Sequence, residues 1–402
     1  MSASSSPSSC SPSDDSAAGL RLVIACGGTG GHVHPALAVG REARRRGADV
    51  VFAVAGQHRG EHLRLARSDG FRAVGIAAPR LPATPRAAAG FMVNFPKGVI
   101  EASRVLRGEG GGVVLGMGSF ASAPVCVAAA LRRSPLFLHE GNAILGRANR
   151  LLSRQARCLA ISLPLAEEQA PRCPTAVTGF PVRESMIAAS RFSVDDAWYR
   201  EWNLEVGRPT LLVFGGSQGA QAINRAMLEA VPVLASTGYR AQILHFTGRE
   251  NNDRCEQVYR QAGWPYRVVR SEALMERAYL LADIVICRAG AATIAELGLF
   301  AKPAILVPLS SAADDHQTAN ARNVEQQAAG VVLAQARLTT ERLAGLLSDW
   351  FENRPAWRQR GDRMRAFAHP HAARDIVEMI LDRTQPGAGQ GAGKQNVKVG
   401  GQ

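Results

Sequence analysis

Two short glycine-rich loops, one in each half of the chain, most constrain what this sequence can fold into. They read GGTGGH at residues 27–32 and GGSQGA at residues 215–220. Each follows an apolar, strand-like run and opens a stretch with helical character. Glycines let the backbone approach a ligand closely, and the unpaired N–H groups at a helix start favour an anion such as phosphate. The repeated strand–loop–helix unit predicts two nucleotide-fold domains that face a shared cleft.

The length and the charge narrow the class of protein. A chain of 402 residues predicts two domains, each with its own core. Lys and Arg number 47 against 34 Asp and Glu, which gives a net charge of +13. Such an excess fits nucleic acid, an anionic membrane surface or phosphorylated substrates, or simply reflects an arginine-rich composition. Only 6% of the residues are aromatic and they do not interleave with basic residues, so nucleic acid is the weakest of these partners.

The two ends of the chain differ in composition from the rest. Residues 1–19 are rich in Ser, Pro and Asp and lack an apolar core, so we expect a disordered tail and no signal peptide. Residues 385–402, heavy in Gly and Gln, indicate a second disordered tail. The nearly uncharged stretch 113–131 contains several glycines and a proline. It predicts a buried strand, a glycine turn and a packed helix, not a membrane span.

Strand-like and helix-like segments alternate in both halves, which predicts an α/β fold. The apolar runs do not alternate with polar residues, so the strands should be buried on both faces in parallel sheets. Strands are expected at 22–26, 50–55, 112–115, 136–139, 210–214, 241–245, 284–287 and 304–307, and helices at 34–46 and 62–68. We expect one domain at 20–182, a linker at 183–206 and a second domain at 207–356. A final helix-like stretch, 357–384, is expected to pack back across the first domain.

The first glycine loop does not fit a dinucleotide or ATP site. Val33 holds the third glycine position of the dinucleotide fingerprint, the next strand ends at Gly56-Gln57 without an acidic residue, and no Gly-Lys-Ser/Thr is present. His32 sits where the loop meets its helix, where an imidazole is kept neutral and can act as a general base. The alternative is that His32 only caps the helix or packs against its neighbours. His32 and His34 do not suit a metal pair, because neighbours at i and i+2 point apart on a helix.

Three more groups of polar residues follow predicted strands. They are His139-Glu140-Gly141-Asn142, the segment 288–293 with Glu296 in the helix that follows it, and Asp314-Asp315-His316-Gln317 with Asn320. Ligands bind at this edge of parallel sheets. Glu296 could accept hydrogen bonds from ribose hydroxyls, and the last group suits sugar hydroxyls better than a metal, because adjacent acids diverge. The alternatives are that the polar loop residues only hydrogen-bond to one another, and that Glu296 is a solvent-exposed glutamate on its helix.

Seven blocks, in this order, resemble the MurG family of peptidoglycan glycosyltransferases. The resemblance runs from about residue 21 to 383. The blocks are GGTGGHVHPALAV (27–39), VVLGMGSFAS (113–122), HEGNAILGRANR (139–150), GFPVR (179–183), GGSQGAQAIN (215–224), CRAGAATIAE (287–296) and DDHQTANA (314–321). The resemblance implies a GT-B glycosyltransferase, with two Rossmann-like parallel-sheet domains facing a cleft and the donor nucleotide held mainly by the second.

The resemblance also implies roles for individual residues. In the donor site for UDP-N-acetylglucosamine, Ser217 and Gln218 would meet the diphosphate, Arg183 would reach the nucleotide and Glu296 would hold the ribose. Gln317, with His316 beside it, and Asn142 would contact the sugar. Thr29 and Gly30 of the first loop are also expected near the donor. Gly28, Thr29, Gly31 and His32 would face the pyrophosphate of the acceptor, and His32 is the candidate base.

The implied reaction is transfer of N-acetylglucosamine to the 4-hydroxyl of the N-acetylmuramoyl pentapeptide of lipid I, with inversion, which forms lipid II. No cofactor and no bound metal are expected, and the chain has no Asp-x-Asp motif. It departs from the commoner family pattern at Gly141, where Gln is usual, at Ser119-Phe120, where Gly-Tyr is usual, and at Phe180, where Asn is usual. These changes lie at loop rims and are expected to affect the acceptor side.

Basic and apolar residues are interleaved in the stretch 80–107. Arg86, Phe91, Met92, Phe95 and Lys97 resemble the family's amphipathic patch that docks on the cytoplasmic leaflet. The resemblance thus implies a peripheral protein on the cytoplasmic side of the inner membrane, with an anionic membrane surface and other proteins of cell-wall synthesis as partners. A buried helix interface is the alternative for this patch.

Three other functions remain open. A diacylglycerol glycosyltransferase shares the first loop and the need for a membrane, although the blocks HEGNAILGRANR and GGSQGA favour the lipid I enzyme. A non-catalytic UDP-sugar-binding membrane module would be expected to have lost the base, whereas His32 is present. A nucleotide-sugar epimerase of the same architecture would need no membrane patch.

Overall fold

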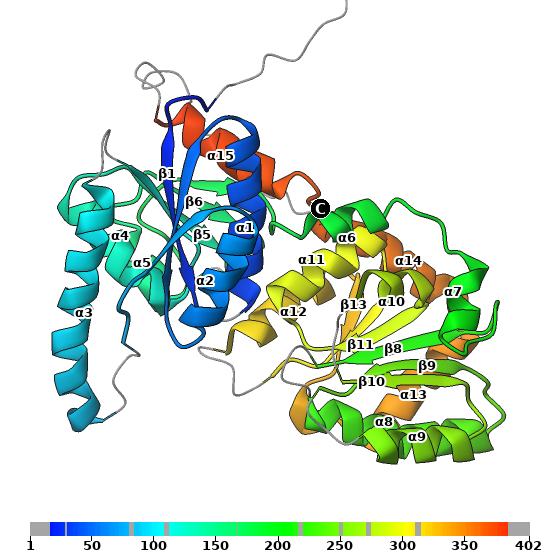
Figure 1. The fold of residues 1–402 in the computed structure, drawn as a ribbon. Coiled ribbons are helices and arrows are strands. Elements are labelled where there is room, and N and C mark those ends of the chain that lie inside the picture. Colours follow the sequence, from blue (N-terminus) through cyan, green and yellow to red (C-terminus); the bar gives the residue numbers. More distant parts are fainter. Residues whose placement is uncertain are drawn as a thin grey trace, which may run out of the picture.

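The computed structural model describes residues 17–28, 30–79, 84–107, 112–166, 168–215, 220–248, 252–270, 275–309 and 315–384, with the backbone alone at 85–88. Within these ranges two parallel sheets, each covered by helices, form two domains placed side by side (Figure 1). We call them the N domain and the C domain. The predicted α/β class with two Rossmann-like sheets is confirmed.

The N domain is built on a sheet with strand order β3-β2-β1-β4-β5-β6-β7, in which all neighbours run parallel. Its strands are β1 (Arg21–Gly27), β2 (Asp49–Ala55), β3 (Arg72–Gly75), β4 (Val113–Gly116), β5 (Leu136–Glu140), β6 (Cys158–Ile161) and β7 (Thr175–Val177). The central strands are buried along nearly their whole length, as their uninterrupted apolar sequences predict. The order reverses between β1 and β4, and a ligand crevice is expected at such a point.

Helices cover both faces of this sheet. They are α1 (Gly30–Arg45), α2 (Arg59–Ser68), α3 (Pro85–Leu106), η1 (Phe120–Ser122), α4 (Ala123–Leu131) and α5 (Arg147–Leu152). Two apolar clusters, one on each face, form the core. The stretch 113–131 folds as predicted, because Gly118, with φ of 75°, makes the turn between buried β4 and α4. Within the described ranges, no helix combines the length and apolar character needed to cross a membrane.

The C domain has a sheet with strand order β10-β9-β8-β11-β12-β13, again parallel throughout. Its strands are β8 (Thr210–Phe214), β9 (Gln242–Phe246), β10 (Tyr266–Val269), β11 (Ile284–Cys287), β12 (Ala304–Leu306) and β13 (Gly330–Val332). The covering helices are α8 (Gln221–Ser236), α9 (Asn252–Gln261), α10 (Met275–Leu281), α11 (Ala291–Phe300), α12 (His316–Gln326), η3 (Gln335–Arg337) and α13 (Thr340–Glu352). Apolar clusters again fill both faces.

The segment between the sheets, where a linker is predicted, contains regular structure. It includes α6 (Glu184–Ala189) and α7 (Asp196–Glu201). Trp202 is 1% exposed and, with Leu204, belongs to an apolar cluster of the C domain. Burial of these two large apolar side chains holds the end of the segment against the C domain.

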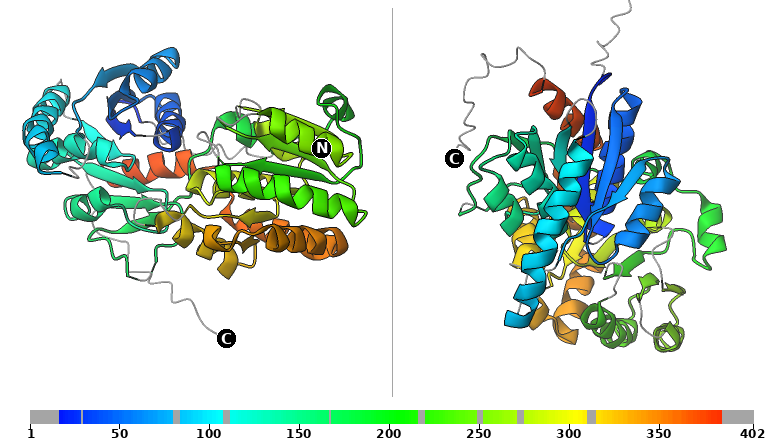
Figure 2. Two further views of the ribbon diagram at one scale, coloured as in Figure 1. Left: turned by 90° about the horizontal axis from the view of Figure 1, so that it is seen from below. Right: turned by 60° about the vertical axis from the view of Figure 1, so that its left-hand side comes forward.

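The end of the chain returns to the N domain. After α14 (Arg354–Met364) and η4 (Arg365–Phe367), helix α15 (Ala372–Asp382) packs beside α1 (Figure 1), and Ile376, Val377 and Ile380 join the N-domain core. Figure 2 shows the same helix, in red, against the N domain from two further directions. The sequence predicted one helical stretch here, but Pro370 separates α14 from α15, because proline lacks the N–H that a continuous helix needs.

Candidate active site

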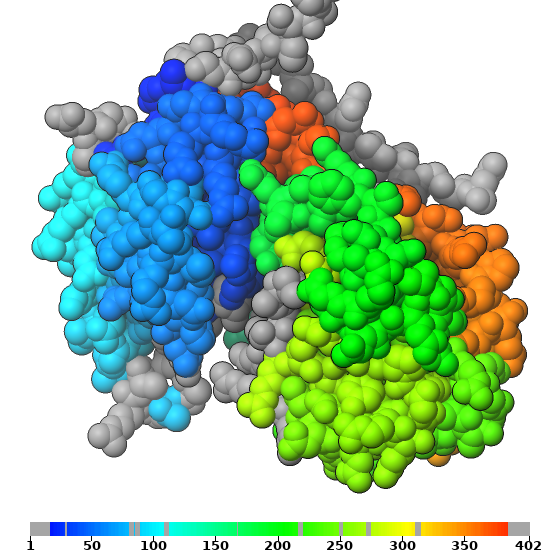
Figure 3. Space-filling view, turned by 45° about the vertical axis from the view of Figure 1, so that its right-hand side comes forward, coloured from blue at the N-terminus to red at the C-terminus, as the bar shows by residue number. Residues whose placement is uncertain are grey.

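The carboxyl ends of the two sheets lie on either side of the space between the domains. In the space-filling view of Figure 3, the blue surface of the N domain and the green and yellow surface of the C domain lie on either side of the junction between the domains. The loop after β5 contacts the start of α11, because a Cβ added to Gly141 would lie 3.5 Å from Cβ of Ala291. The polar residues that follow strands in the two halves therefore meet at one place.

The first glycine loop brings the end of β1 very close to its neighbours. A Cβ on Gly27 would lie 2.0 Å from the carbonyl oxygen of Ala55, at the end of β2. Gly28 has φ of 88° and its Cβ would lie 2.7 Å from Oγ of Ser119. Only glycine fits at these two positions. Thr29, predicted to contact both substrates, lies outside the described residues, whereas Gly30 and Gly31 open α1 with exposed backbone.

His32 lies between two glycine turns of the N domain. A Cβ on Gly28 would lie 3.8 Å from its Nδ1, and a Cβ on Gly118 would lie 3.8 Å from its Nε2. Burial, and then the nearby charges of His316 and His62, lower the pKa of His32 to about 4. The imidazole is therefore neutral at physiological pH, as predicted, although burial is the main cause and not the helix start alone. The charge of His316, on α12 of the C domain, is among the causes of this shift.

His139 and Glu140, two members of the group 139–142, hydrogen-bond to other residues of the N domain. His139 Nε2 lies 3.0 Å from Oγ of Ser162, and burial lowers the pKa of His139 to about 3. Buried Glu140 accepts hydrogen bonds from the N–H of Gly146, at 2.9 Å, and from Nδ2 of Asn149, at 3.0 Å. For these two residues the structure matches the alternative of a satisfied loop network.

Asn142 is held between its own loop and the C domain. Its Nδ2 donates to Oε1 of Glu140, at 3.2 Å, and its Oδ1 accepts from Nδ2 of Asn320, at 3.0 Å. Fully buried Asn320 also accepts from the N–H of Ala143, at 2.9 Å, and donates to the carbonyl of Ala289, at 3.0 Å. The side chain of Asn320 thus joins α12, the loop after β5 and the loop after β11.

Glu296 and Arg183 occupy the C-domain side of the space. Half-buried Glu296, on α11, accepts a hydrogen bond through Oε2 from the hydroxyl of Tyr279 on α10, at 3.0 Å. Arg183, at the start of α6, lies 4.0 Å from the carboxylate of Glu276 on α10. Helix α10 therefore positions both residues. Tyr279 and Glu276 were not identified from the sequence, because their contacts with Glu296 and Arg183 join segments that are far apart in the chain.

His316 and Gln317 form the first turn of α12, which begins after Asp315 in a left-handed conformation, with φ of 53°. Oε1 of Gln317 accepts a hydrogen bond from the N–H of Leu309, at 3.0 Å. The amide group of Gln317 is therefore oriented by the backbone that follows β12. Ser217 and Gln218, predicted to meet the diphosphate, lie outside the described residues.

The unusual residues Gly141 and Phe180 are neighbours in space. A Cβ on Gly141 would lie 2.9 Å from Cε2 of Phe180, closer than a real contact allows. The Phe180 ring also packs edge-on against His139, with centroids 5.8 Å apart. The large side chain at 180 thus occupies room that a side chain at 141 would need. The sequence indicated that both positions depart from the commoner family pattern. It did not indicate that the small residue at 141 makes room for the large residue at 180.

Polar groups gather here without grouping as metal ligands. Across the described ranges, no three His, Cys, Asp or Glu side chains come together in a way that could hold a metal ion. The groups that do converge are hydrogen-bonding amides, one carboxylate and a neutral imidazole. Asn142 and Gln317 supply amides, Glu296 a carboxylate and His32 a neutral imidazole, and these groups suit a nucleotide sugar and an acceptor hydroxyl.

Comparison with known proteins defines the class. Residues 22–161 match the N-terminal domain of glycosyltransferase family 28, and residues 210–378 match its C-terminal domain. The crystal structure of MurG from Acinetobacter baumannii superposes with a TM-score of 0.72 at 28% identity, over 90% of this chain and 99% of that one. The chain is therefore a glycosyltransferase with the GT-B fold.

Curated relatives define the family within this class. A UDP-N-acetylglucosamine--N-acetylmuramyl-(pentapeptide) pyrophosphoryl-undecaprenol N-acetylglucosamine transferase from Syntrophotalea carbinolica is 41% identical over 340 residues, which cover 84% of this chain and 91% of that protein. One of the same name from Hahella chejuensis is 36% identical, over 90% of this chain and 97% of that protein. The chain belongs to this family, the MurG family, and the predicted resemblance is confirmed.

Proposed function

We propose that this protein transfers N-acetylglucosamine from UDP-N-acetylglucosamine to N-acetylmuramyl-(pentapeptide) pyrophosphoryl-undecaprenol, lipid I, and so makes lipid II for peptidoglycan. The relatives that cover most of the chain carry this activity in their names. The observation that best supports the reaction is a neutral histidine, His32, at the start of α1 beside the first glycine loop. This arrangement favours an enzyme over a UDP-sugar-binding module without a base.

The C domain is proposed to hold the donor. Glu296, oriented by Tyr279, would accept hydrogen bonds from the ribose, and Arg183 would lie near the nucleotide. Gln317, His316 and Asn142 would surround the sugar, with Thr29 and Gly30 approaching from the first loop. Ser217 and Gln218 would bind the diphosphate. The start of a helix after a glycine loop suits that anion, because its N–H groups point outward.

The N domain is proposed to hold the acceptor and the base. Gly28, Thr29 and Gly31 would face the acceptor pyrophosphate, with His32 beside the 4-hydroxyl of the N-acetylmuramoyl group. The neutral imidazole takes the hydroxyl proton as the oxygen attacks the anomeric carbon. The bond from that carbon to the diphosphate breaks, and UDP leaves with the electron pair on the opposite face, so the configuration inverts. The negative phosphates of both substrates would raise the pKa of His32 and strengthen it as a base.

Helix α3 is proposed to dock on an anionic membrane surface. In Figure 1 it stands on the outer side of the N domain, away from the C domain. Met92 and Val93 are 70% and 69% exposed, and Lys97 is exposed beside them. The side chain of Arg86, also predicted for this patch, lies outside the described residues. Exposed apolar side chains with a basic neighbour fit an interfacial helix better than a buried interface.

Aromatic stacking connects this helix to the first glycine loop. Phe91 and Phe95 stack on one another, with centroids 5.2 Å apart, and each lies 5.9 Å from Phe120. Phe120 follows Ser119, whose Oγ lies against Gly28. Docking of α3 would therefore bring the proposed acceptor site next to the lipid that carries the acceptor. We accordingly assign acceptor and membrane binding to residues 20–182 and donor binding to residues 207–356, and we place the protein on the cytoplasmic side of the inner membrane.

The identity of the acceptor distinguishes this reaction from the alternative, in which the sugar is transferred to diacylglycerol. Labelled UDP-N-acetylglucosamine, offered with lipid I and, separately, with diacylglycerol, should label lipid I alone. Transfer to diacylglycerol would favour the other lipid glycosyltransferase.

A further inference from the structure

A second pocket lies in the C domain, between α14 and the amino ends of β11 and β12. Its volume is about 280 Å³, close to the lower end of the ~300–1,000 Å³ typical of small-molecule sites. The loops of the candidate active site follow the carboxyl ends of the strands, whereas Asp283 and Pro303 of this pocket directly precede β11 and β12. The pocket is therefore at the opposite end of the sheet from the candidate active site.

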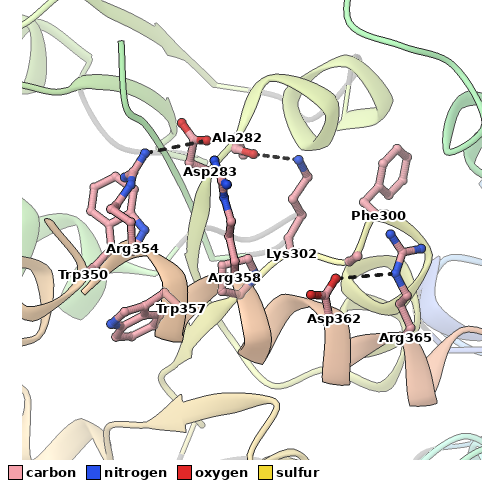
Figure 4. A pocket seen from close by; sticks show the side chains of 12 residues that line it. Ala282, Asp283, Phe300, Lys302, Trp350, Arg354, Trp357, Arg358, Asp362 and Arg365 are labelled. Carbon is pink, nitrogen blue, oxygen red and sulfur yellow. Dashed lines mark hydrogen bonds and ion pairs between the residues drawn. The ribbon is translucent and has the colours of Figure 1, made fainter. Parts of the chain in front are cut away.

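Positive charge dominates the lining of this pocket. Figure 4 shows the side chains of the four basic and two acidic residues that line it: Lys302, Arg354, Arg358, Arg365, Asp283 and Asp362. Each acidic residue already has a partner. Asp283 accepts a hydrogen bond from the N–H of Thr210, at 2.8 Å, and Asp362 lies 4.0 Å from Arg365. The excess of cations suits a ligand with more than one negative charge.

Arg354 is held in the pocket wall with hydrogen-bonding capacity unused by the protein. Its guanidinium stacks on the ring of Trp350, 4.1 Å from the centroid. Its nearest carboxylate oxygen, on Asp283, is 3.9 Å away, which is too far for a hydrogen bond. Nη1 is buried and has no hydrogen-bond partner among the described residues. A buried donor without an acceptor is costly, and an anion in the pocket would supply that acceptor.

Arg358 adds a second guanidinium one helical turn further along α14. Burial, and to a smaller extent the charge of Arg358, lowers the pKa of Arg354, whereas the carboxylate of Asp283 raises it, so the two guanidinium groups are close enough to repel each other. Like charges at i and i+4 destabilise a helix. Lys302 forms part of the lining nearby, fixed by donation from Nζ to the carbonyl of Ala282, at 2.7 Å (Figure 4). A bound polyanion would relieve the repulsion between the two guanidinium groups.

We propose that this pocket binds a soluble oxyanion with at least two negative charges, of the pyrophosphate or organic phosphate class, at Arg354 and Arg358. The site is separate from the proposed donor site and does not depend on the proposed reaction. Arginine forks suit such an anion, because they donate two parallel hydrogen bonds to neighbouring oxygens.

Isothermal titration calorimetry with sodium pyrophosphate tests the site directly. The protein is first saturated with UDP, which occupies the proposed donor site. Pyrophosphate that binds at the proposed acceptor site gives a separate event, which substitutions at Arg354 and Arg358 leave unchanged. We expect one pyrophosphate per chain to bind at this pocket. Arg354→Gln and, separately, Arg358→Gln should each weaken this event about tenfold or more, as loss of a charge-assisted hydrogen bond predicts.

A matched control separates the pocket from the general positive charge of the chain. Arg363→Gln removes the same charge from the same helix, but Arg363 is exposed and does not line the pocket. This variant should bind pyrophosphate like the unchanged protein. Arg358 is also exposed, so its replacement leaves the fold intact even if the change at Arg354 does not. The proposal would be overturned if the UDP-saturated protein bound no pyrophosphate, if neither Arg354→Gln nor Arg358→Gln weakened the binding, or if Arg363→Gln weakened it equally.

Discussion

Nδ2 of Asn320, on helix α12 of the C domain, donates a hydrogen bond to Oδ1 of Asn142, on the loop after β5 of the N domain, at 3.0 Å. The same buried amide group bonds to the backbone of Ala143 and Ala289. One side chain therefore fixes the position of helix α12 relative to two loops at the candidate active site. Asn142, proposed to contact the donor sugar, is oriented from the opposite domain.

Replacement of Asn320 should impair catalysis without removing any group that we assign to a substrate. Asn320→Ala leaves the N–H of Ala143 and the carbonyl of Ala289 without their partner, at a cost of ~1–3 kcal/mol for each buried group. We expect kcat/KM for UDP-N-acetylglucosamine to fall roughly tenfold or more, which steady-state kinetics would measure. Arg322→Ala, on the exposed side of the same helix, should change little. Equal kinetics in the two variants would show that the contact between domains is not needed.

Glu296 should contribute to donor affinity through its carboxylate. Glu296→Ala is expected to raise the Kd for UDP about tenfold or more, because hydrogen bonds to a charged group are worth ~1.5–3 kcal/mol. Tyr279→Phe keeps the carboxylate but removes the hydroxyl that orients it, so its effect should be smaller. Calorimetric titration with UDP measures the Kd of both variants. Unchanged affinity in Glu296→Ala would refute the assignment to the ribose.

The pKa of His32 should be far below that of an exposed histidine and should respond to His316. Burial and the charge of His316 disfavour the imidazolium, which gives a pKa of about 4. The base form is lost as pH falls through this value, so the acid limb of kcat/KM should lie far below 6.5. His316→Gln removes a repelling charge and should move the pKa upward.

Titration of the imidazole by NMR measures this shift in the free protein. His58→Gln serves as the control, since His58 is not among the charges that affect His32. A pKa of His32 near 6.5 in the unchanged protein would contradict the burial that we describe, and an unchanged pKa in His316→Gln would contradict the approach of the two domains.

The exposed face of α3 should control membrane binding. The double variant Met92→Ser and Lys97→Glu removes exposed apolar area and reverses one charge, so binding to vesicles with phosphatidylglycerol should fall at least about tenfold. Vesicle sedimentation at constant salt measures the bound fraction. UDP affinity should stay the same, because α3 lies far from the C domain (Figure 1). Full retention on vesicles would exclude this helix as the docking surface.

Much of the fold could be predicted from the sequence, because most central strands are recognisable as continuous apolar runs. β1 and β8 are continuous apolar runs followed by glycine loops, and their bounds agree with prediction within one residue. All four edge strands, β3, β7, β10 and β13, were missed, since they are short and partly exposed and lack such runs. The buried interior strand β6 was also missed, because its apolar run is only four residues long. Their place in the sheet depends on pairing with neighbours that sequence pattern alone does not reveal.

Site residues could be predicted where a single motif in the sequence identifies them. They could not be predicted where their role depends on contacts between distant segments. His32 follows a glycine loop, so its position could be inferred locally, whereas its lowered pKa depends on burial and on the charge of His316 in the other domain. The contact of Tyr279 with Glu296 and the fit of Phe180 against Gly141 join residues far apart in the chain. Such contacts exist only after the sheets and domains have assembled.

Transfer to lipid I is the most direct test of the proposed reaction. Purified protein would be incubated with labelled UDP-N-acetylglucosamine and lipid I in anionic vesicles, and the label in the lipid product would be followed over time, with His32→Ala as the matched variant. We predict rapid formation of a disaccharide-lipid with a β-1,4 linkage, and in His32→Ala a loss of turnover that greatly exceeds any loss of UDP affinity. No label in the lipid with the unchanged protein, or an α-linked product, would contradict the proposed reaction.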